Sequence, residues 1–164
     1  PIRVTSGGGK YRFPTDDQET PDTHTATFDF DGKSITWEGR SFHKRGFEGN
    51  GFGMAFYGTG GTLLIENGGY RVLDMNDKEV VNVPGTAAQE PHLQNFFDCI
   101  KSGKRPNADV EDGHKSTLLC HLGNIAWRTE STLKIDPKTG HILGNKAASA
   151  LWGREYRKGW EPKV

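Results

Sequence analysis

The fold of this chain is decided by residues 92–128, which have the sequence HLQNFFDCIKSGKRPNADVEDGHKSTLLCHLGNIAWR. Apolar residues recur at helical spacing in its first part, and Ser102-Gly103 with Pro106 ends that helix. Asp109 can cap a second helix. The stretch therefore predicts two amphipathic helices. In the first helix the apolar stripe is expected to face a core and consists of Leu93, Phe96, Phe97 and Ile100. In the second helix the stripe is expected to be buried and consists of Leu118, Leu119, Leu122, Ile125 and Ala126.

The residues before this stretch have the patterns of strands and turns. Apolar positions alternate with polar ones in residues 26–30 and 35–38, on either side of Asp31-Gly32, which predicts a hairpin. Short strands are also expected over four further ranges, and their short connections favour antiparallel neighbours: 52–57, 62–66, 70–74 and 79–83. Strands first and helices later indicate an α+β fold, with a mostly antiparallel sheet and helices packed on one face.

Two or three helices cannot cover both faces of such a sheet. We therefore expect an open face that carries aromatic residues and associates with a second copy of the chain. The alternative is that the aromatic residues all point toward the helices.

Length and composition set further limits. The 164 residues fit one domain, 1–164, and the 21 Lys and Arg balance the 21 Asp and Glu, so no strong field attracts nucleic acid or an anionic membrane. Cys99 and Cys120 suit small buried thiols, although they can pair if their helices pack closely. No apolar run reaches the length of a membrane span. Because the chain opens on Pro1 in an apparent strand, we expect a piece of a longer protein.

No catalytic constellation is visible in the residues. The glycine clusters Gly7–Gly9 and Gly58–Gly61 do not fall between a strand and a helix, so no cofactor-binding residues are expected. The six histidines lack the spacing of a metal site. The sequence therefore predicts no catalytic, cofactor or metal residues.

Several motifs resemble one known domain. They are the H-x-x-N-F-x-D-x-I-x-S-G-x-x-P pattern of residues 92–106 and the segments GGGKYRFPTDDQETPDTHTATFDF, FYGTGGTLLIENGGYRVLD, LKIDPKTGHILGNKAAS and REYRKGW. Together they resemble the C-terminal domain of Gfo/Idh/MocA oxidoreductases with sugar-related substrates. The resemblance implies an open-faced sheet of the dihydrodipicolinate reductase-like type.

The resemblance also implies a function for a longer parent protein. Such proteins use NAD or NADP, held by an N-terminal Rossmann domain whose motifs this sequence lacks, to oxidise or reduce a sugar or cyclitol. Some cleave glycosides through transient oxidation instead. This chain would then be the substrate-binding and oligomerisation half, inactive alone, with a homo-oligomer formed through the sheet. The alternative is a stand-alone carbohydrate-binding or scaffold module. The compartment stays open between cytoplasm and periplasm.

Sugar recognition combines an aromatic platform with charged or planar hydrogen-bonding groups. Trp37, Arg40, His43 and Arg45 provide these types at a strand end and the following loop, and His92 lies at the entry to the first helix. These five residues are the expected substrate-binding set. The alternatives are core packing for Trp37 and surface ion pairs for Arg40 and Arg45.

Overall fold

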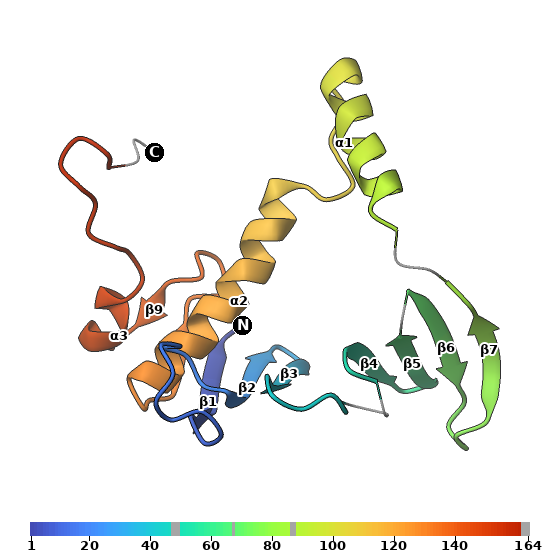
Figure 1. Cartoon of the computed structure of the whole chain (residues 1–164), viewed down its shortest axis with the longest axis horizontal. Helices are drawn as coiled ribbons and strands as arrows, with labels where there is room; N and C mark the ends of the chain where they lie inside the picture. Colours follow the sequence, from blue (N-terminus) through green and yellow to red (C-terminus); the bar gives the residue numbers. More distant parts are fainter. Residues whose placement is uncertain (47–49, 67, 86–87, 162–164) are drawn as a thin grey trace. The chain divides into compact units, whose positions relative to one another are not determined.

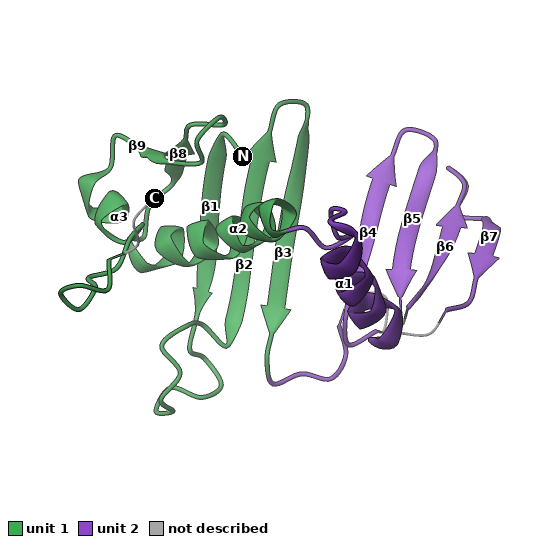
Figure 2. Ribbon diagram, turned by 90° about the horizontal axis from the view of Figure 1, so that it is seen from above, with its two compact units in different colours: residues 1–41, 110–164 green, residues 42–109 purple. Residues whose placement is uncertain are grey.

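The computed structural model describes residues 1–46, 50–66, 68–85 and 88–161. The chain divides into two compact units: unit 1 is residues 1–41 and 110–164, and unit 2 is residues 42–109 (Figure 2). The elements, drawn in Figure 1, are in chain order β1 (Arg3–Gly9), β2 (Thr23–Phe30), β3 (Lys33–Arg40), β4 (Gly53–Gly58), β5 (Gly61–Glu66), β6 (Gly69–Leu73), β7 (Glu79–Val83), α1 (Glu90–Ser102), α2 (Val110–Arg128), β8 (Leu133–Ile135), β9 (Ile142–Leu143) and α3 (Lys146–Ala150).

Unit 1 is an antiparallel sheet with α2 lying across it (Figure 2). The strand order is β3-β2-β1-β8-β9, so the first strand of the chain pairs with β2 on one side and with β8 on the other. The expected hairpin is confirmed: Phe30 pairs with Lys33, and Gly32 has a φ of 71° in the turn between them. A positive φ is a conformation that glycine adopts without a steric penalty.

The core of unit 1 lies between this sheet and α2. Val4, Leu122 and Leu133 are its fully enclosed large side chains, and each contributes about 1.5–3 kcal/mol through apolar burial. The predicted stripe of α2 is confirmed, because its residues are buried or pack against the core. The buried cluster is Val4, Ala26, Phe28, Leu122, Ile125, Ala126, Leu133, Ile135, Ile142 and Ala148, with Leu118 and Leu119 packed against it.

The register of β1, β2 and β3 places polar side chains on the face away from α2. Directly paired residues share a face. Since Val4 pairs with Phe28, which pairs with Ile35, the alternate positions form the opposite face. We call it the polar sheet face: Arg3, Thr5, Gly7 and Gly9 on β1, Thr23, Thr25, Thr27 and Asp29 on β2, and Ser34, Thr36, Glu38 and Arg40 on β3. The aromatic residues of β2 and β3 are all on the other face.

Unit 2 contains an antiparallel sheet in the order β4-β5-β6-β7, close to the four predicted strands. One of its faces is entirely apolar by register, and we call it the apolar sheet face: Met54, Phe56, Leu63, Ile65, Tyr70, Val72, Val81 and Val83. On the other face Arg71 binds Glu66 through two hydrogen bonds of 2.9 and 3.1 Å and lies 3.6 Å from Glu79. The hydrogen bonds from Arg71 lower the pKa of Glu66, and the two ion pairs of Arg71 together link β5, β6 and β7.

Helix α1 begins and ends close to where the sequence predicts. Gly103 caps it with a φ of 67° and donates its backbone N–H to the carbonyl of Cys99. The expected burial of its apolar stripe, however, is wrong in this structure: Leu93, Phe96, Phe97 and Ile100 are each more than half exposed. Helical spacing specifies which side of a helix is apolar but not which element covers it.

The α+β class and the antiparallel pairing are confirmed, with the strands distributed over two sheets. The organisation of 1–164 as one domain stays a prediction. Both cysteines are free, Cys99 is half-buried, and the expectation of a buried Cys120 thiol is wrong, since Cys120 is exposed. Among the helices described here, none is long and apolar enough to cross a membrane.

Candidate substrate-binding site

Trp37 and Arg40 lie on opposite faces of β3. Trp37 pairs with Ala26 on the face toward α2, and Arg40 pairs with Thr23 on the polar sheet face. Trp37 lies beyond the buried cluster and is 51% exposed, with its indole nitrogen close to Gly39. The structure therefore does not combine these two predicted residues in one binding surface. Their separation by three positions is the sequence signal for this result, because strand side chains alternate with a period of two.

Arg40 is paired with a neighbour on its own strand. Its guanidinium donates a hydrogen bond to the carboxylate of Glu38, two positions earlier on the polar sheet face. Both side chains are about half exposed, so the pair adds little to stability. The Arg40 guanidinium, a donor, and the Glu38 carboxylate, an acceptor, nevertheless lie side by side and are accessible to solvent. Glu38 is not among the residues expected from the sequence, although its spacing from Arg40 puts it on the same face.

His43 and Arg45 form a local turn in unit 2. The backbone N–H of Arg45 donates to Nδ1 of His43 at 3.2 Å. The carbonyl oxygen of Arg45 lies 3.3 Å from the same Nδ1, so the tautomer of the ring decides which of the two contacts is a hydrogen bond. Both residues are exposed, so the ring is accessible to a ligand from the Nε2 side.

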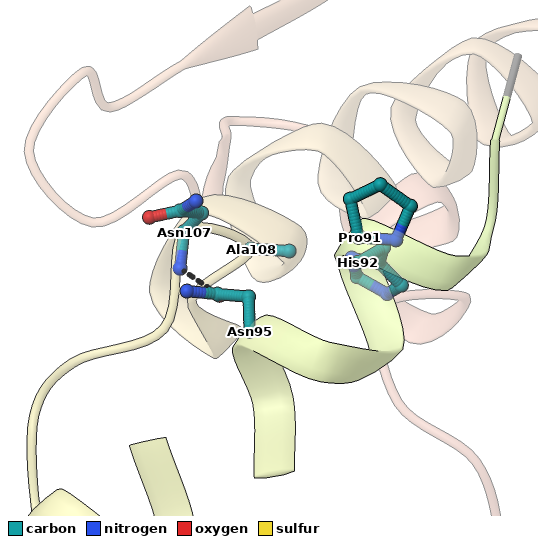
Figure 3. A pocket seen from close by; sticks show the side chains of 5 residues that line it. All are labelled: Pro91, His92, Asn95, Asn107 and Ala108. Atoms are coloured by element: carbon teal, nitrogen blue, oxygen red, sulfur yellow. Dashed lines mark hydrogen bonds between the residues drawn. The ribbon is translucent and has the colours of Figure 1, made fainter. Parts of the chain in front are cut away.

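His92 lies in a surface hollow of unit 2 with a volume of about 290 Å³. The hollow lies between the first turn of α1 and the segment that precedes α2 (Figure 3), and it is lined by Pro91, His92, Asn95, Asn107 and Ala108. Oδ1 of Asn95 accepts a hydrogen bond of 2.9 Å from the backbone N–H of Asn107. This hydrogen bond connects α1 to the segment that precedes α2, and it determines the orientation of the Asn95 amide.

Asn95 and Asn107 are absent from the residues expected from the sequence. Asn95 follows His92 by three positions, so helical spacing puts the two on the same side of α1. Asn107 comes from the turn after the helix, and only the fold brings it to the hollow. Neutral amides and an imidazole line this hollow, which suits hydroxyl groups as partners.

The glycine segments do not have the geometry that a dinucleotide needs. A pyrophosphate is held where a glycine turn leads from a strand into a helix. Gly7–Gly9 lies within β1, and Gly58–Gly61 joins β4 to β5. These glycine segments do not fit a dinucleotide cofactor. Within the described ranges, no group of three or more His, Cys, Asp or Glu side chains is placed to hold a metal ion.

Comparison with protein families identifies the domain. A Gfo/Idh/MocA family model, described as the oxidoreductase family, C-terminal alpha/beta domain, matches residues 58–162, which is more than half of the chain. The chain belongs to this family. In this Gfo/Idh/MocA C-terminal domain the matched range includes the hollow at His92, whereas β1, β2 and β3 precede it. The comparisons with curated proteins and with solved structures gave no match.

Proposed function

We propose that this Gfo/Idh/MocA C-terminal domain is the substrate-binding and oligomerisation part of an NAD(P)-dependent oxidoreductase that acts on a sugar or cyclitol. Family membership supports the oxidoreductase, and the exposed Glu38–Arg40 pair supports the substrate. NAD or NADP, bound elsewhere in the parent protein, would exchange hydride with a carbon of the substrate.

The chemistry of the Glu38–Arg40 pair suits a vicinal diol. The guanidinium can donate to one hydroxyl oxygen, and the carboxylate can accept a hydrogen bond from the neighbouring hydroxyl. The pair has no net charge, so it favours a neutral polyol over an anionic sugar acid. The hollow at His92 is the second candidate for the same ligand class, because its amide groups also both donate and accept.

Ligand titration by saturation-transfer NMR tests the substrate site. The probes are methyl β-D-glucoside and myo-inositol, added to the 164-residue chain. Arg40→Ala is expected to weaken binding about tenfold, the loss that corresponds to about 1.4 kcal/mol of hydrogen bonding. Arg3→Ala is the matched control, because Arg3 forms a similar pair with Asp29 on the polar sheet face. Unchanged binding in Arg40→Ala with a loss in His92→Ala would move the site to the hollow.

Association with a second copy is proposed to use the apolar sheet face. Met54, Phe56 and Tyr70 on this face are each more than 40% exposed. A shallow hollow of about 250 Å³ lies beside them, lined by Leu63, Ile65, Gly68, Gly69 and Tyr70. A contiguous apolar surface of this kind is hydrated poorly, and a symmetric dimer would bury it on both copies at once.

Sedimentation across a concentration series tests this association. The chain is expected to form a dimer or larger species, and Phe56→Glu is expected to make it monomeric. Tyr57→Glu is the matched control, since Tyr57 is the next residue of β4 and points to the opposite face. A monomeric wild-type chain at high concentration would remove the oligomerisation part of the proposal.

Two alternatives differ in the parent protein. A parent of the same family that cleaves glycosides would use the same sugar site, and assays of its products would distinguish it. A stand-alone carbohydrate-binding or scaffold module would lack a dinucleotide-binding domain. Upstream coding sequence with a strand, G-x-G-x-x-G and a helix would support the oxidoreductase.

A further inference from the structure

The aromatic ring of Tyr11 lies on the polar sheet face, in the space beside Gly9, which has no side chain of its own. A Cβ placed on Gly9 would be 2.6 Å from Cε1 of Tyr11, so the tyrosine ring occupies the space beside this glycine. Gly9 pairs with Thr23, and Thr23 pairs with Arg40. Since paired residues share a face, Gly9, Thr23 and Arg40 form one row across β1, β2 and β3, and the Tyr11 ring lies beside its Gly9 end.

The loop that carries Tyr11 is held in place by a buried carboxylate. This loop, residues 10–22, joins β1 to β2 and lies at the same end of the sheet as the end of β3 (Figure 2). Asp22 is 2% exposed and accepts hydrogen bonds from the backbone N–H groups of Tyr11, Arg12 and Phe13 at 3.2, 2.9 and 2.9 Å. Hairpin loops usually have about 2–5 residues, and longer ordered loops are commonly functional.

The same loop is also joined to β3 and to α2. The backbone N–H of Ser41, which follows Arg40, donates to the carbonyl of Asp22 at 3.0 Å. Arg128 at the end of α2 binds Glu19 at 3.0 Å. Tyr11 is 72% exposed although its backbone is fixed, so its ring is presented to solvent with little backbone freedom to lose on binding.

The spacing of the row fits a small ring compound. Adjacent strands lie about 4.8 Å apart, so β1 and β3 are separated by roughly 10 Å at this row. Between them the hydroxyl of Thr23 donates to Oδ1 of Asp22 at 2.8 Å, which leaves its lone pairs to accept from a ligand. In the next row Gly7 faces open space beside Thr25 and Glu38. The surface thus has an aromatic ring at one end and a donor–acceptor pair at the other, with the Thr23 hydroxyl between them.

We propose that Tyr11 is the aromatic platform of the substrate site, stacking on the C–H face of a neutral polyol ring whose hydroxyls bind Arg40 and Glu38. Tyr11 takes the place that the sequence suggests for Trp37, which lies on the other face of the sheet. This inference rests on the proposed function. It adds a binding residue from the loop and a requirement for glycine at position 9.

Titration of the chain with methyl β-D-glucoside and myo-inositol by saturation-transfer NMR tests the inference. Tyr11→Ala is expected to weaken binding of the better probe about tenfold, whereas Tyr11→Phe keeps the ring and stays within about threefold of the wild type. Gly9→Ala keeps the tyrosine but fills the space of its ring, and it is expected to weaken binding as well. Trp37→Leu is the control on the opposite face and is expected to bind like the wild type.

The outcomes separate this inference from the proposed function. Wild-type binding in both Tyr11→Ala and Gly9→Ala, with a loss in Arg40→Ala, would overturn the role of Tyr11 and leave the proposed substrate site standing. A loss in Trp37→Leu without a loss in Tyr11→Ala would overturn it as well. If the wild-type chain binds neither probe, both the substrate site and the role of Tyr11 are overturned. Thermal melting of each variant confirms that it is folded.

Discussion

At the scale of single residues, Asp22 combines burial with charge. Removal from water raises the pKa of this carboxyl, but the hydrogen bonds from the Phe13 backbone, the Thr23 hydroxyl and the Arg12 and Tyr11 backbones outweigh that cost, and the net pKa is lowered. The folded chain therefore favours the ionised form more than the unfolded chain does. This stabilisation is present above the ordinary aspartate pKa of about 4 and is lost as the pH falls through the lower folded value.

Asp22→Asn is therefore expected to lower the melting temperature at neutral pH and to flatten its decline below about pH 4. The amide offers N–H groups where the loop needs an acceptor. Thermal melts between pH 2 and 7 would measure both effects. Asp17→Asn, at an exposed carboxylate of the same loop, is the control. Identical acid profiles for the wild type and Asp22→Asn would contradict this role of Asp22.

His24 is expected to give a second pH dependence. Its ring nitrogen Nε2 lies 2.6 Å from Oγ of Ser6 on the face toward α2, and burial lowers its pKa. A lowered histidine pKa means that stability is complete above the ordinary value of about 6.5 and decreases as the pH falls through it.

Removing the ionisable ring is expected to abolish this decrease. His24→Gln keeps a hydrogen-bonding side chain for Ser6 without an ionisable ring, so its melting temperature should vary less between pH 7 and 5 than that of the wild type. His121→Gln, at an exposed position of α2, is expected to leave the decrease unchanged. An equal decrease in the wild type and His24→Gln would assign it to another group.

At the scale of elements, the two long helices differ in what covers them. Leu122 of α2 is fully buried, whereas Leu93 of α1 is 51% exposed. Leu122→Ala is expected to cost about 2–5 kcal/mol of unfolding free energy, and Leu93→Ala less than about 1 kcal/mol. Urea denaturation of both variants gives the comparison with the same substitution in each helix. A cost of several kcal/mol for Leu93→Ala would mean that the stripe of α1 is covered in solution.

The long helices and the first hairpin could be predicted from the sequence, whereas the elements that pack or pair with them could not. Residues 92–128 give both long helices because apolar spacing and Gly103 act locally, and the hairpin at Asp31-Gly32 follows from alternation. The row of Gly9, Thr23 and Arg40 depends on the pairing register of three strands, and the position of the Tyr11 ring beside Gly9 depends on the path of the loop. Register is a nonlocal property that turn residues constrain only in part. The separation of Trp37 from Arg40 was predictable from the sequence. Strand side chains alternate between the two faces, so residues three positions apart lie on opposite faces.

At the scale of the whole molecule, two glycine segments in the described part of the chain predict the response to cofactor. The chain alone is expected to bind neither NAD nor NADP measurably, because Gly7–Gly9 and Gly58–Gly61 do not lead into a helix. Calorimetric titration with each dinucleotide measures this directly. Micromolar affinity for either one would show that one of these segments holds phosphate.

The order of strands in unit 1 has a consequence for synthesis on the ribosome. Arg3 pairs with Lys134, and the whole of unit 2 is translated between β3 and the elements that complete the first sheet. At about 5–20 residues per second, the ribosome takes roughly 5 to 20 seconds to proceed from residue 41 to residue 135. During that interval the nascent hairpins expose the open edge of β1 and the apolar side chains of Val4 and Phe28, which invites pairing with other chains. A chaperone that recognises open strand edges would therefore act on residues 1–41 first.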